Sequence, residues 1–255
     1  MSMQLGMVQS AVAMNGLERW QQAVSHNLAA AQVAGFKPVQ GSFQATLAGQ
    51  LPGSTRAELM SAPSEGRSPT YQQTRNFAGG SLRSTDNPND VALTGEGFFT
   101  IEAAGGETLY TRNGEFHVSP ENYLVTSNGS LVMGDAGPIQ LTPGQGQLKI
   151  TADGRVSQGL LPLGNLQIAQ FESPQKLIPT GGSFRVDPEN DPGAAAMDQN
   201  AISLAQGFVE ESGVQPIQEM VNLITISRAH ETHQKIIQSY DQRLQQTIQT
   251  LGDTR

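Results

Sequence analysis

The sequence predicts an α+β fold in which long N- and C-terminal helices form a coiled-coil-like α domain, with a central all-β domain of short hairpins between them in the chain. Apolar and small residues recur at alternating spacings of four and three near both ends, which is the heptad pattern of a helix seam. The middle of the 255-residue chain instead consists of short β-branched and aromatic runs separated by turn residues. We therefore expect residues 1–43 and 212–255 to form an assembly domain, 44–79 an extended connector and 80–211 the β domain.

The N-terminal helix is predicted from a heptad seam with one clear polar interruption, at Gln21. We expect the helix to end at Gly35, because glycine closes helices in the left-handed conformation. Pro38 then prevents the helix from continuing. The predicted seam consists of Met3, Met7, Ser10, Met14, Leu17, Gln21, Val24, Leu28 and Ala31.

The C-terminal helix is predicted to begin at Pro216, since proline is well suited to the first helical position. No glycine or proline follows before Leu251, so a helix of roughly 50 Å is possible at 1.5 Å per residue. Ile217, Met220 and Ile224 extend an apolar face at its start. The predicted seam consists of Leu223, Ile226, His230, His233, Ile237, Tyr240, Leu244, Thr247 and Leu251.

The central segment carries the turn signals of small hairpins. Gly105-Gly106, Asn113-Gly114, Pro120–Asn122 and Asn128-Gly129 each separate short runs of strand-forming residues. Asn-Gly between such runs is the strongest short-range hairpin signal. The sequence before this segment is polar and has no clear period, which is why an extended connector is expected there.

Composition excludes several classes of function. The net charge of −8 argues against a general nucleic-acid partner, which needs a basic face. The absence of cysteine excludes disulfides, thiol catalysis and zinc–thiolate sites. The sequence contains no run of about 18 apolar residues, so no membrane span is expected. The N-terminal sequence lacks the pattern of a cleavable signal peptide.

Four stretches in order resemble the rod and hook components of the bacterial flagellum, the basal-body axial proteins. They are "HNLAAAQVAGFK", "NPNDVALTGEGFFTI", "YTRNGEFHVSPENYLVTSNGSLVMG" and "ESGVQPIQEMVNLITISRAHETHQKIIQSYDQRL". Ala30, Ala34, Gly213 and His230 depart from the family pattern, whose usual residues there are Asn, Thr, Asn and Tyr. Proximal and distal rod types both stay open, and "GPIQLTPGQGQLKITADG" is more similar to the proximal type.

The resemblance implies a structural subunit of the basal-body rod, without enzymatic activity or cofactor, in the helical drive shaft between motor and hook. It implies a helical homo-oligomer whose partners are other rod proteins, the hook, the surrounding ring proteins and the flagellar type III export apparatus. The expected location is the periplasm-spanning rod, reached without a cleavable signal peptide. The residues expected at the assembly interface are Met7, Met14, Leu17, Val24, Asn27, Leu28, Gly35, Phe36, Met220, Leu223, Ile226, His230, Ile237, Tyr240, Leu244 and Leu251.

Other functions are compatible with parts of the sequence. A secreted β-domain binding module with coiled-coil oligomerisation, such as an adhesin or a tail-like component, is the alternative. His230 and His233 lie three apart, whereas the metalloprotease pattern needs four, so we expect seam residues that make assembly sensitive to pH rather than a metal site. Residues 86–90, "DNPND", lack the glycine of a calcium loop and are expected to form a turn.

Overall fold

The structure is a computed structural model that describes residues 2–47, 67–190, 192–196 and 203–252. The chain forms two compact units. The helical unit comprises Met1–Ala29, Val39–Thr74 and Gln215–Arg255, and the β unit comprises Ala30–Pro38 and Arg75–Val214. Each unit is therefore built from segments that lie far apart in the sequence.

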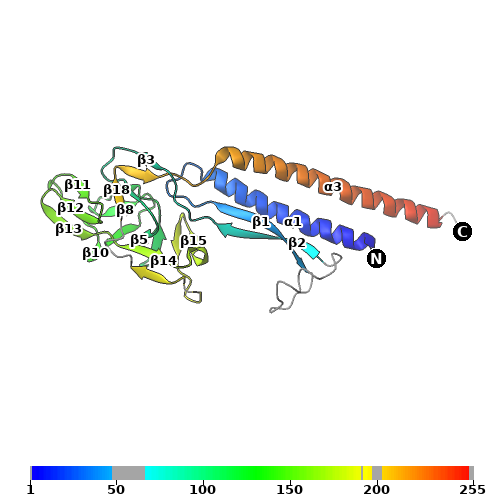
Figure 1. The fold of residues 1–255 in the computed structure, drawn as a ribbon, viewed down its shortest axis with the longest axis horizontal. Helices are drawn as coiled ribbons and strands as arrows, with labels where there is room; N and C mark the ends of the chain where they lie inside the picture. Colours follow the sequence, from blue (N-terminus) through cyan, green and yellow to red (C-terminus); the bar gives the residue numbers. More distant parts are fainter. Residues whose placement is uncertain (1, 48–66, 191, 197–202, 253–255) are drawn as a thin grey trace. The chain divides into compact units, whose positions relative to one another are not determined.

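The helical unit contains two helices and a two-stranded sheet (Figure 1). Helix α1 spans Ser2–Ala29 and helix α3 spans Pro216–Gly252, so α3 begins at the predicted proline. Strands β1 (Val39–Leu47) and β2 (Arg67–Arg75) pair with each other. Strand β2 and the last four residues of β1 fall within the segment expected to be an extended connector, whereas most of β1 falls in the segment expected to form the helical assembly domain. Residues 48–66 of the connector lie outside the described part.

An aromatic cluster packs the sheet of the helical unit onto α1. The Trp20 ring from α1 meets the Phe43 ring from β1 edge to face at 5.8 Å, and Phe43 meets Tyr71 from β2 at 5.2 Å. Gly16 makes this possible, because a Cβ atom there would lie 2.8 Å from Cε1 of Phe43. The glycine that weakens the helix by propensity thus allows a strand to approach it closely.

The predicted coiled-coil-like α domain is wrong. Within the described residues the structure has one helix near each end of the chain and a large β-rich central region, and no coiled coil joins the helices. The buried contact of α1 with α3 is a short cluster around Leu17, Val24 and Ile226. Ile226 is the only α3 residue that is buried among those whose side chains are described. A heptad seam would bury residues along the whole helix, but here α1 turns part of its apolar face to the β1–β2 sheet instead.

Helix α1 also ends six residues before the predicted stop at Gly35. The hydroxyl of Ser212 donates to the carbonyl of Ala30 at 3.0 Å, and the amide of Gly35 donates to the carbonyl of Glu210 at 2.8 Å. These contacts with a distant segment take up backbone groups in the stretch where the helix was expected to continue.

The β unit is built on a ten-stranded sheet, of which seven strands follow the order β15-β16-β6-β5-β9-β8-β7. Its pairings are antiparallel, with Thr100 opposite Tyr110 and His117 opposite Val125 as examples of the register. The strands of this sheet are β5 (Phe98–Glu102), β6 (Thr108–Thr111), β7 (Phe116–Val118), β8 (Leu124–Thr126), β9 (Leu131–Gly134), β10 (Gly137–Pro138), β14 (Ile168–Phe171), β15 (Ile178–Thr180), β16 (Ser183–Arg185) and β17 (Ala194–Ala196).

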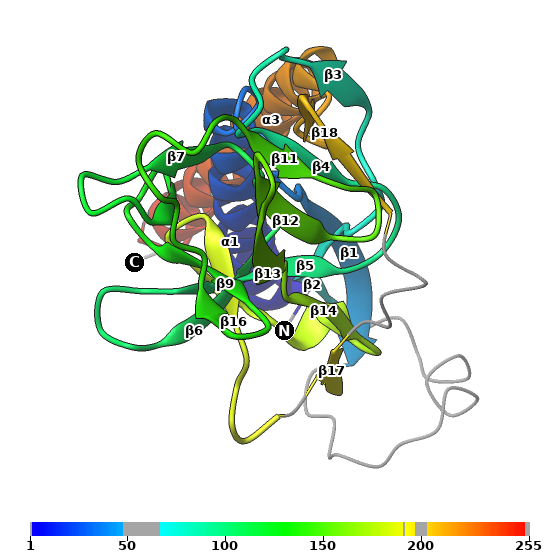
Figure 2. The same cartoon turned by 90° about the vertical axis from the view of Figure 1, so that its left-hand side faces the viewer.

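Smaller sheets complete the β unit. Figure 2 shows β11, β12 and β13 side by side as one three-stranded sheet. Strand β18 pairs with β4, and β19 pairs with β3, so chain segments from both ends of the β unit meet. The remaining elements are β3 (Leu82–Ser84), β4 (Val91–Leu93), β11 (Leu148–Ile150), β12 (Arg155–Gln158), β13 (Leu161–Asn165), the 3₁₀ helix η2 (Pro174–Lys176), β18 (Leu204–Gln206) and β19 (Phe208–Glu210).

One predicted hairpin turn is wrong. Turns at Gly105-Gly106, Pro120–Asn122 and Asn128-Gly129 do join antiparallel neighbours. Asn113-Gly114 does not, because β6 pairs with β5 and β16 while β7 pairs with β8. The carbonyl of Gly114 instead accepts a hydrogen bond from the amide of Val91 at 3.0 Å, and a Cβ atom at this glycine would collide with Val91.

The β unit has two apolar clusters. The larger cluster gathers side chains from several strands around fully buried Phe99, Phe116 and Leu124. The smaller cluster holds Phe98, Phe171 and Phe184, whose rings meet edge to face at 5.5 Å and 5.7 Å from Phe98. Together they give this unit a core that does not depend on the terminal helices.

Candidate assembly interface

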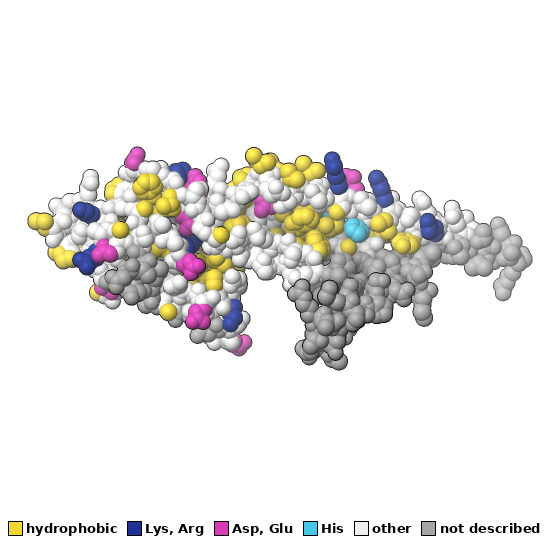
Figure 3. All heavy atoms as spheres, viewed as in Figure 1, with side chains coloured by type: hydrophobic (Ala, Val, Ile, Leu, Met, Phe, Trp, Pro, Cys, Tyr) yellow, Lys and Arg dark blue, Asp and Glu magenta, His cyan; other side chains and the backbone are white. Residues whose placement is uncertain are grey.

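The first turns of α3 carry an exposed apolar face. Ile217, Met220, Val221 and Ile224 are each between 49% and 80% exposed. Their spacing of three and four places them on one side of the helix, and Figure 3 shows hydrophobic side chains gathered along this part of α3. Such a face is the arrangement that docks a helix onto a partner surface.

A polar network fixes the end of α1 within the helical unit. The Asn27 amide donates to the carbonyl of Val39 and to Oε1 of Glu219, both at 2.8 Å, and its oxygen accepts from the amide of Val39 at 2.9 Å. Asn27 is buried, so each of these polar groups needs its partner. One asparagine thus ties α1, β1 and α3 together.

The residues predicted at the assembly interface fall into several environments in the single chain. Leu17, Val24, Asn27, Gly35 and Ile226 are buried within the chain, and Met220 is exposed. The half-buried members are Met14, Leu28, Phe36, Leu223, His230, Ile237 and Tyr240. The side chains of Met7, Leu244 and Leu251 lie outside the described part. Their role in contacts between subunits stays a prediction.

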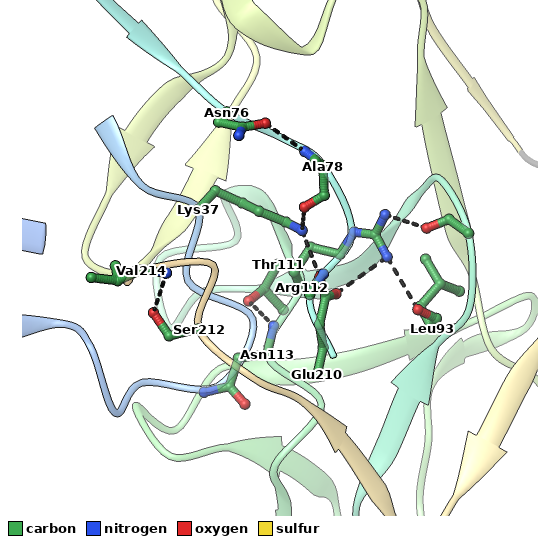
Figure 4. Close-up of polar contacts among 12 residues, drawn as sticks. Lys37, Asn76, Ala78, Leu93, Thr111, Arg112, Asn113, Glu210, Ser212 and Val214 are labelled. Atoms are coloured by element: carbon green, nitrogen blue, oxygen red, sulfur yellow. Dashed lines mark hydrogen bonds and ion pairs between the residues drawn. The ribbon is translucent and has the colours of Figure 1, made fainter. Parts of the chain in front are cut away.

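A buried ionic cluster lies in the β unit (Figure 4). Nζ of Lys37 lies 2.6 Å from Oε1 of Glu210, and Nη1 of Arg112 lies 3.4 Å from Oε2 of the same carboxylate. The Lys37 and Glu210 side chains are only 1% and 2% exposed. Lys37 also donates to the carbonyl of Ala78 at 2.7 Å, and the amide of Gly80 donates to Glu210 at 2.7 Å. Two buried cations therefore share one carboxylate.

Burial lowers the pKa of Lys37 below its ordinary 10.5, and the hydrogen bond and charge of Glu210 oppose that shift. Burial likewise lowers the pKa of Arg112, against the attraction of Glu210 and Glu96. Arg112 is further held by the carbonyl of Leu93, at 3.3 Å from Nη1. The cluster is therefore a structural junction in which each cation depends on fixed acceptors.

The backbone around Gly35 and Phe36 packs tightly inside the β unit. Gly35 has a φ of +66°, and a Cβ atom there would lie 2.4 Å from the carbonyl carbon of Arg112. The amide of Gly213 donates to the carbonyl of Phe36 at 3.0 Å. The Arg75 guanidinium lies 5.8 Å from the Phe36 ring centroid. The Gly35–Lys37 run thus contacts residues near both ends of the Arg75–Val214 segment, namely Arg75 and Gly213.

The two histidines of α3 are half-buried and carry unused ring nitrogens. Nε2 of His230 and Nδ1 of His233 are buried with no hydrogen-bond partner among the described residues. No group of three or more His, Asp or Glu side chains suited to a metal ion occurs in the described part of the chain. Neither described helix has a stretch that is apolar and uncharged enough to cross a membrane.

A polar pocket of about 410 Å³ lies next to the ionic cluster in the β unit. Arg75 and Arg112 line it together with Glu96 and Glu172, so opposite charges face it in equal number. Gln170 donates to Glu96 at 3.1 Å across this wall. The described residues that line this pocket include no nucleophile paired with a base, so the pocket shows no catalytic arrangement of that kind.

Sequence reasoning missed the ionic cluster and the aromatic cluster of the helical unit. Lys37 and Glu210 are 173 residues apart, and neither has a local pattern that indicates the other. The one available signal was that Lys37 follows a Gly-Phe pair and precedes a proline, a position where the chain is already constrained.

Two family models match the chain. The "Flagellar hook protein FlgE/F/G D1 domain" matches residues 92–158, and the "Flagellar basal body rod FlgEFG protein C-terminal" matches residues 205–250. The first match lies in the β unit, and the second includes most of α3.

Several curated proteins are similar over nearly the whole chain. "Flagellar basal-body rod protein FlgF" of Mesorhizobium japonicum is 34% identical, over 92% of this chain and 93% of its own length. The protein of the same name from Salmonella typhimurium is 32% identical, over 87% of this chain and 88% of its own length. "Flagellar basal-body rod protein FlgG" of Buchnera aphidicola subsp. Baizongia pistaciae is 31% identical, over 92% and 96%.

Proposed function

This chain belongs to the flagellar basal-body rod proteins, and we propose that it joins the rod by burying the apolar face of α3 against neighbouring subunits. The exposed stretch from Ile217 to Ile224 is the observation that carries this proposal. It offers apolar surface that the single chain does not cover.

The predicted resemblance is confirmed, and the chain is a structural subunit of the basal-body rod. Relatives named as rod proteins match it over most of their length. The alternative, a secreted binding module with coiled-coil oligomerisation, is not supported by these matches.

The energetics favour association of this face. Fully burying a large apolar side chain contributes about 1.5–3 kcal/mol. Met220 and the three neighbours of the α3 face are partly exposed, so each retains a share of that free energy for a partner. Because helical polymers place many copies next to one another, the same face is buried once per subunit.

The predicted interface residues fit a second role within this proposal. Leu17, Val24 and Ile226 pack inside the helical unit and hold α1 against α3. The half-buried residues farther along α3, Ile237 and Tyr240 among them, then add to the contact with neighbouring subunits. The interface then has two parts: buried residues that hold α1 and α3 together within one chain, and an exposed face of α3 that contacts neighbouring subunits.

We further propose that the subunit works in the periplasm-spanning rod between motor and hook, without enzymatic activity. There it forms a helical homo-oligomer that meets other rod proteins, the hook and the surrounding ring proteins. Export through the flagellar type III apparatus as an unfolded chain fits a sequence without cysteine, because refolding then needs no redox step.

Charge introduced into the α3 face tests the proposal in cells. We expect Met220→Asp and Ile224→Asp, expressed in cells that lack the natural copy, to remove the chain from isolated basal bodies and to stop motility. Gln218→Asp is the matched control, since Gln218 is exposed on the same helix outside the four apolar positions. Normal incorporation of both apolar-face variants would refute the proposal.

A further inference from the structure

The hairpin between β12 and β13 ends in two consecutive leucines. Leu160 is 103% exposed and Leu161 is 42% exposed. Gly159 turns the chain with a φ of +60°. Gln158, the last residue of β12, fixes the start of this turn through two side-chain hydrogen bonds. The Gln158 amide donates to the carbonyl of Gly146 at 3.1 Å, and its oxygen accepts from the amide of Thr142 at 2.8 Å. The leucines therefore project from an ordered tip, which lowers the entropic cost of docking them.

A pocket elsewhere in the β unit is suited to such a tip. It has a volume of about 520 Å³ and lies along β7, β8 and the turns that flank β8. Val125, Leu131, Tyr123 and Pro120 contribute apolar wall. Strand β7 lies at the end of the principal strand order of its sheet, so the pocket opens beside a strand edge. Figure 3 shows hydrophobic side chains at the surface of this unit.

The three-stranded sheet that carries the tip and the wall of the pocket each hold a charged side chain without an ion-pair partner among the described residues, and the two charges are opposite. Lys149 on β11 lies opposite Ser157 of β12, on the exposed side of the three-stranded sheet. Arg155 is paired with Asp153 at 2.9 Å, whereas Lys149 has no ion-pair partner among the described residues. Glu121, in the wall of the pocket, likewise has no ion-pair partner in the described part of the chain. Opposite charges at matching surfaces steer and orient association.

We infer that the Leu160–Leu161 tip of one subunit docks into the β7–β8 pocket of a second copy of this chain. The tip and the pocket are different surfaces of the same unit, so the contact is head-to-tail. A head-to-tail contact that does not close into a ring repeats along a helical assembly. The inference rests on the proposed assembly of the subunit in the rod and adds a second contact, between β units.

Disulfide capture tests this contact directly, because the natural chain contains no cysteine. Leu160→Cys and Ser127→Cys are expressed together as separate full-length chains, and isolated basal bodies are mildly oxidised and run on a non-reducing gel. Ser127 is exposed and lines the pocket. We expect a cross-linked dimer of this chain that disappears on reduction. Leu160→Cys with Glu107→Cys, an exposed position in the β5–β6 turn, is the control and should give no dimer.

Charge reversal adds an independent readout. Lys149→Glu and Glu121→Lys, each combined with the cysteine pair, should lower the cross-linking yield about two- to fivefold, the range for an exposed ion pair. The two reversals together should restore the yield of the unmodified charges. A loss in both single variants that the combination does not repair would overturn the assigned pairing.

The outcomes separate this contact from the proposed function. If the cysteine variants are present in basal bodies but give no dimer, the contact is overturned and the rod proposal stands. If the chain itself is missing from basal bodies of cells that carry the natural sequence, the rod proposal falls and this contact falls with it. If Leu160→Cys instead forms a disulfide with a different protein, that protein and not a second copy of this chain contacts the tip, and the inference is overturned.

Discussion

At the scale of single residues, one carboxylate keeps two buried cations in the β unit. We expect Glu210→Ala to lower the free energy of unfolding by about 3–5 kcal/mol, because Lys37 and Arg112 are then left without their counter-ion. Lys37→Met should cost less, about 1–2 kcal/mol, because the pair of Arg112 with Glu210 remains and only the two hydrogen bonds of Lys37, to Ala78 and Glu210, are lost. Urea unfolding followed by circular dichroism measures both. Equal losses in the two variants would contradict the shared-carboxylate arrangement.

Asn27 allows a similar comparison in the helical unit. Asn27→Ala should cost about 1–3 kcal/mol, since it leaves partly buried polar groups of Val39 without partners. Asn27→Asp should cost more, because a carboxylate oxygen would then face the carbonyl of Val39 and the carboxylate of Glu219. Trp20 is the only tryptophan and packs inside this unit, so its fluorescence reports the transition. A milder effect of the aspartate would argue against the observed orientation of the amide.

At the scale of elements, two glycines differ in what surrounds them. Gly35→Ala should destabilise the β unit by about 2–4 kcal/mol, because its φ is positive and the new Cβ would collide with the backbone of Arg112. Gly16→Ala is the comparison. Its Cβ would crowd the edge of the Phe43 ring at 2.8 Å and contact Cβ of Tyr71 at 3.5 Å, and a helix-propensity gain of about 1 kcal/mol offsets the crowding. Thermal unfolding of both variants should show the larger loss for Gly35→Ala, and the reverse order would be inconsistent with the packing.

The elements also show where sequence reasoning succeeds and where it fails. The start of α3 at Pro216 follows from a local rule, and so do the turns at Pro120–Asn122 and Asn128-Gly129. The end of α1 and the chain path at Gly114 are set by contacts with distant residues, Ser212 and Val91 respectively. Local propensity is overridden where buried backbone groups find partners far along the chain.

For the candidate interface, the sequence located the right helices but assigned the wrong packing between them. The heptad spacing of α3 predicted a continuous seam, yet Ile226 is the only one of the described seam side chains that is buried in the single chain. Spacing alone specifies which residues share a helix face, not what covers that face. The strands that pack onto α1 through Phe43 and Tyr71 were not expected from a polar segment without period.

For the whole molecule, the decisive property is whether the exposed α3 face drives association. Sedimentation velocity of the purified full-length chain over a range of concentrations tests this most directly. We expect the natural chain to form larger species as its concentration rises. Ile224→Asp should remain a monomer with an unchanged circular dichroism spectrum, because the substitution lies on an exposed position. A natural chain that stays monomeric, or a variant that associates equally well, would contradict association through the α3 face.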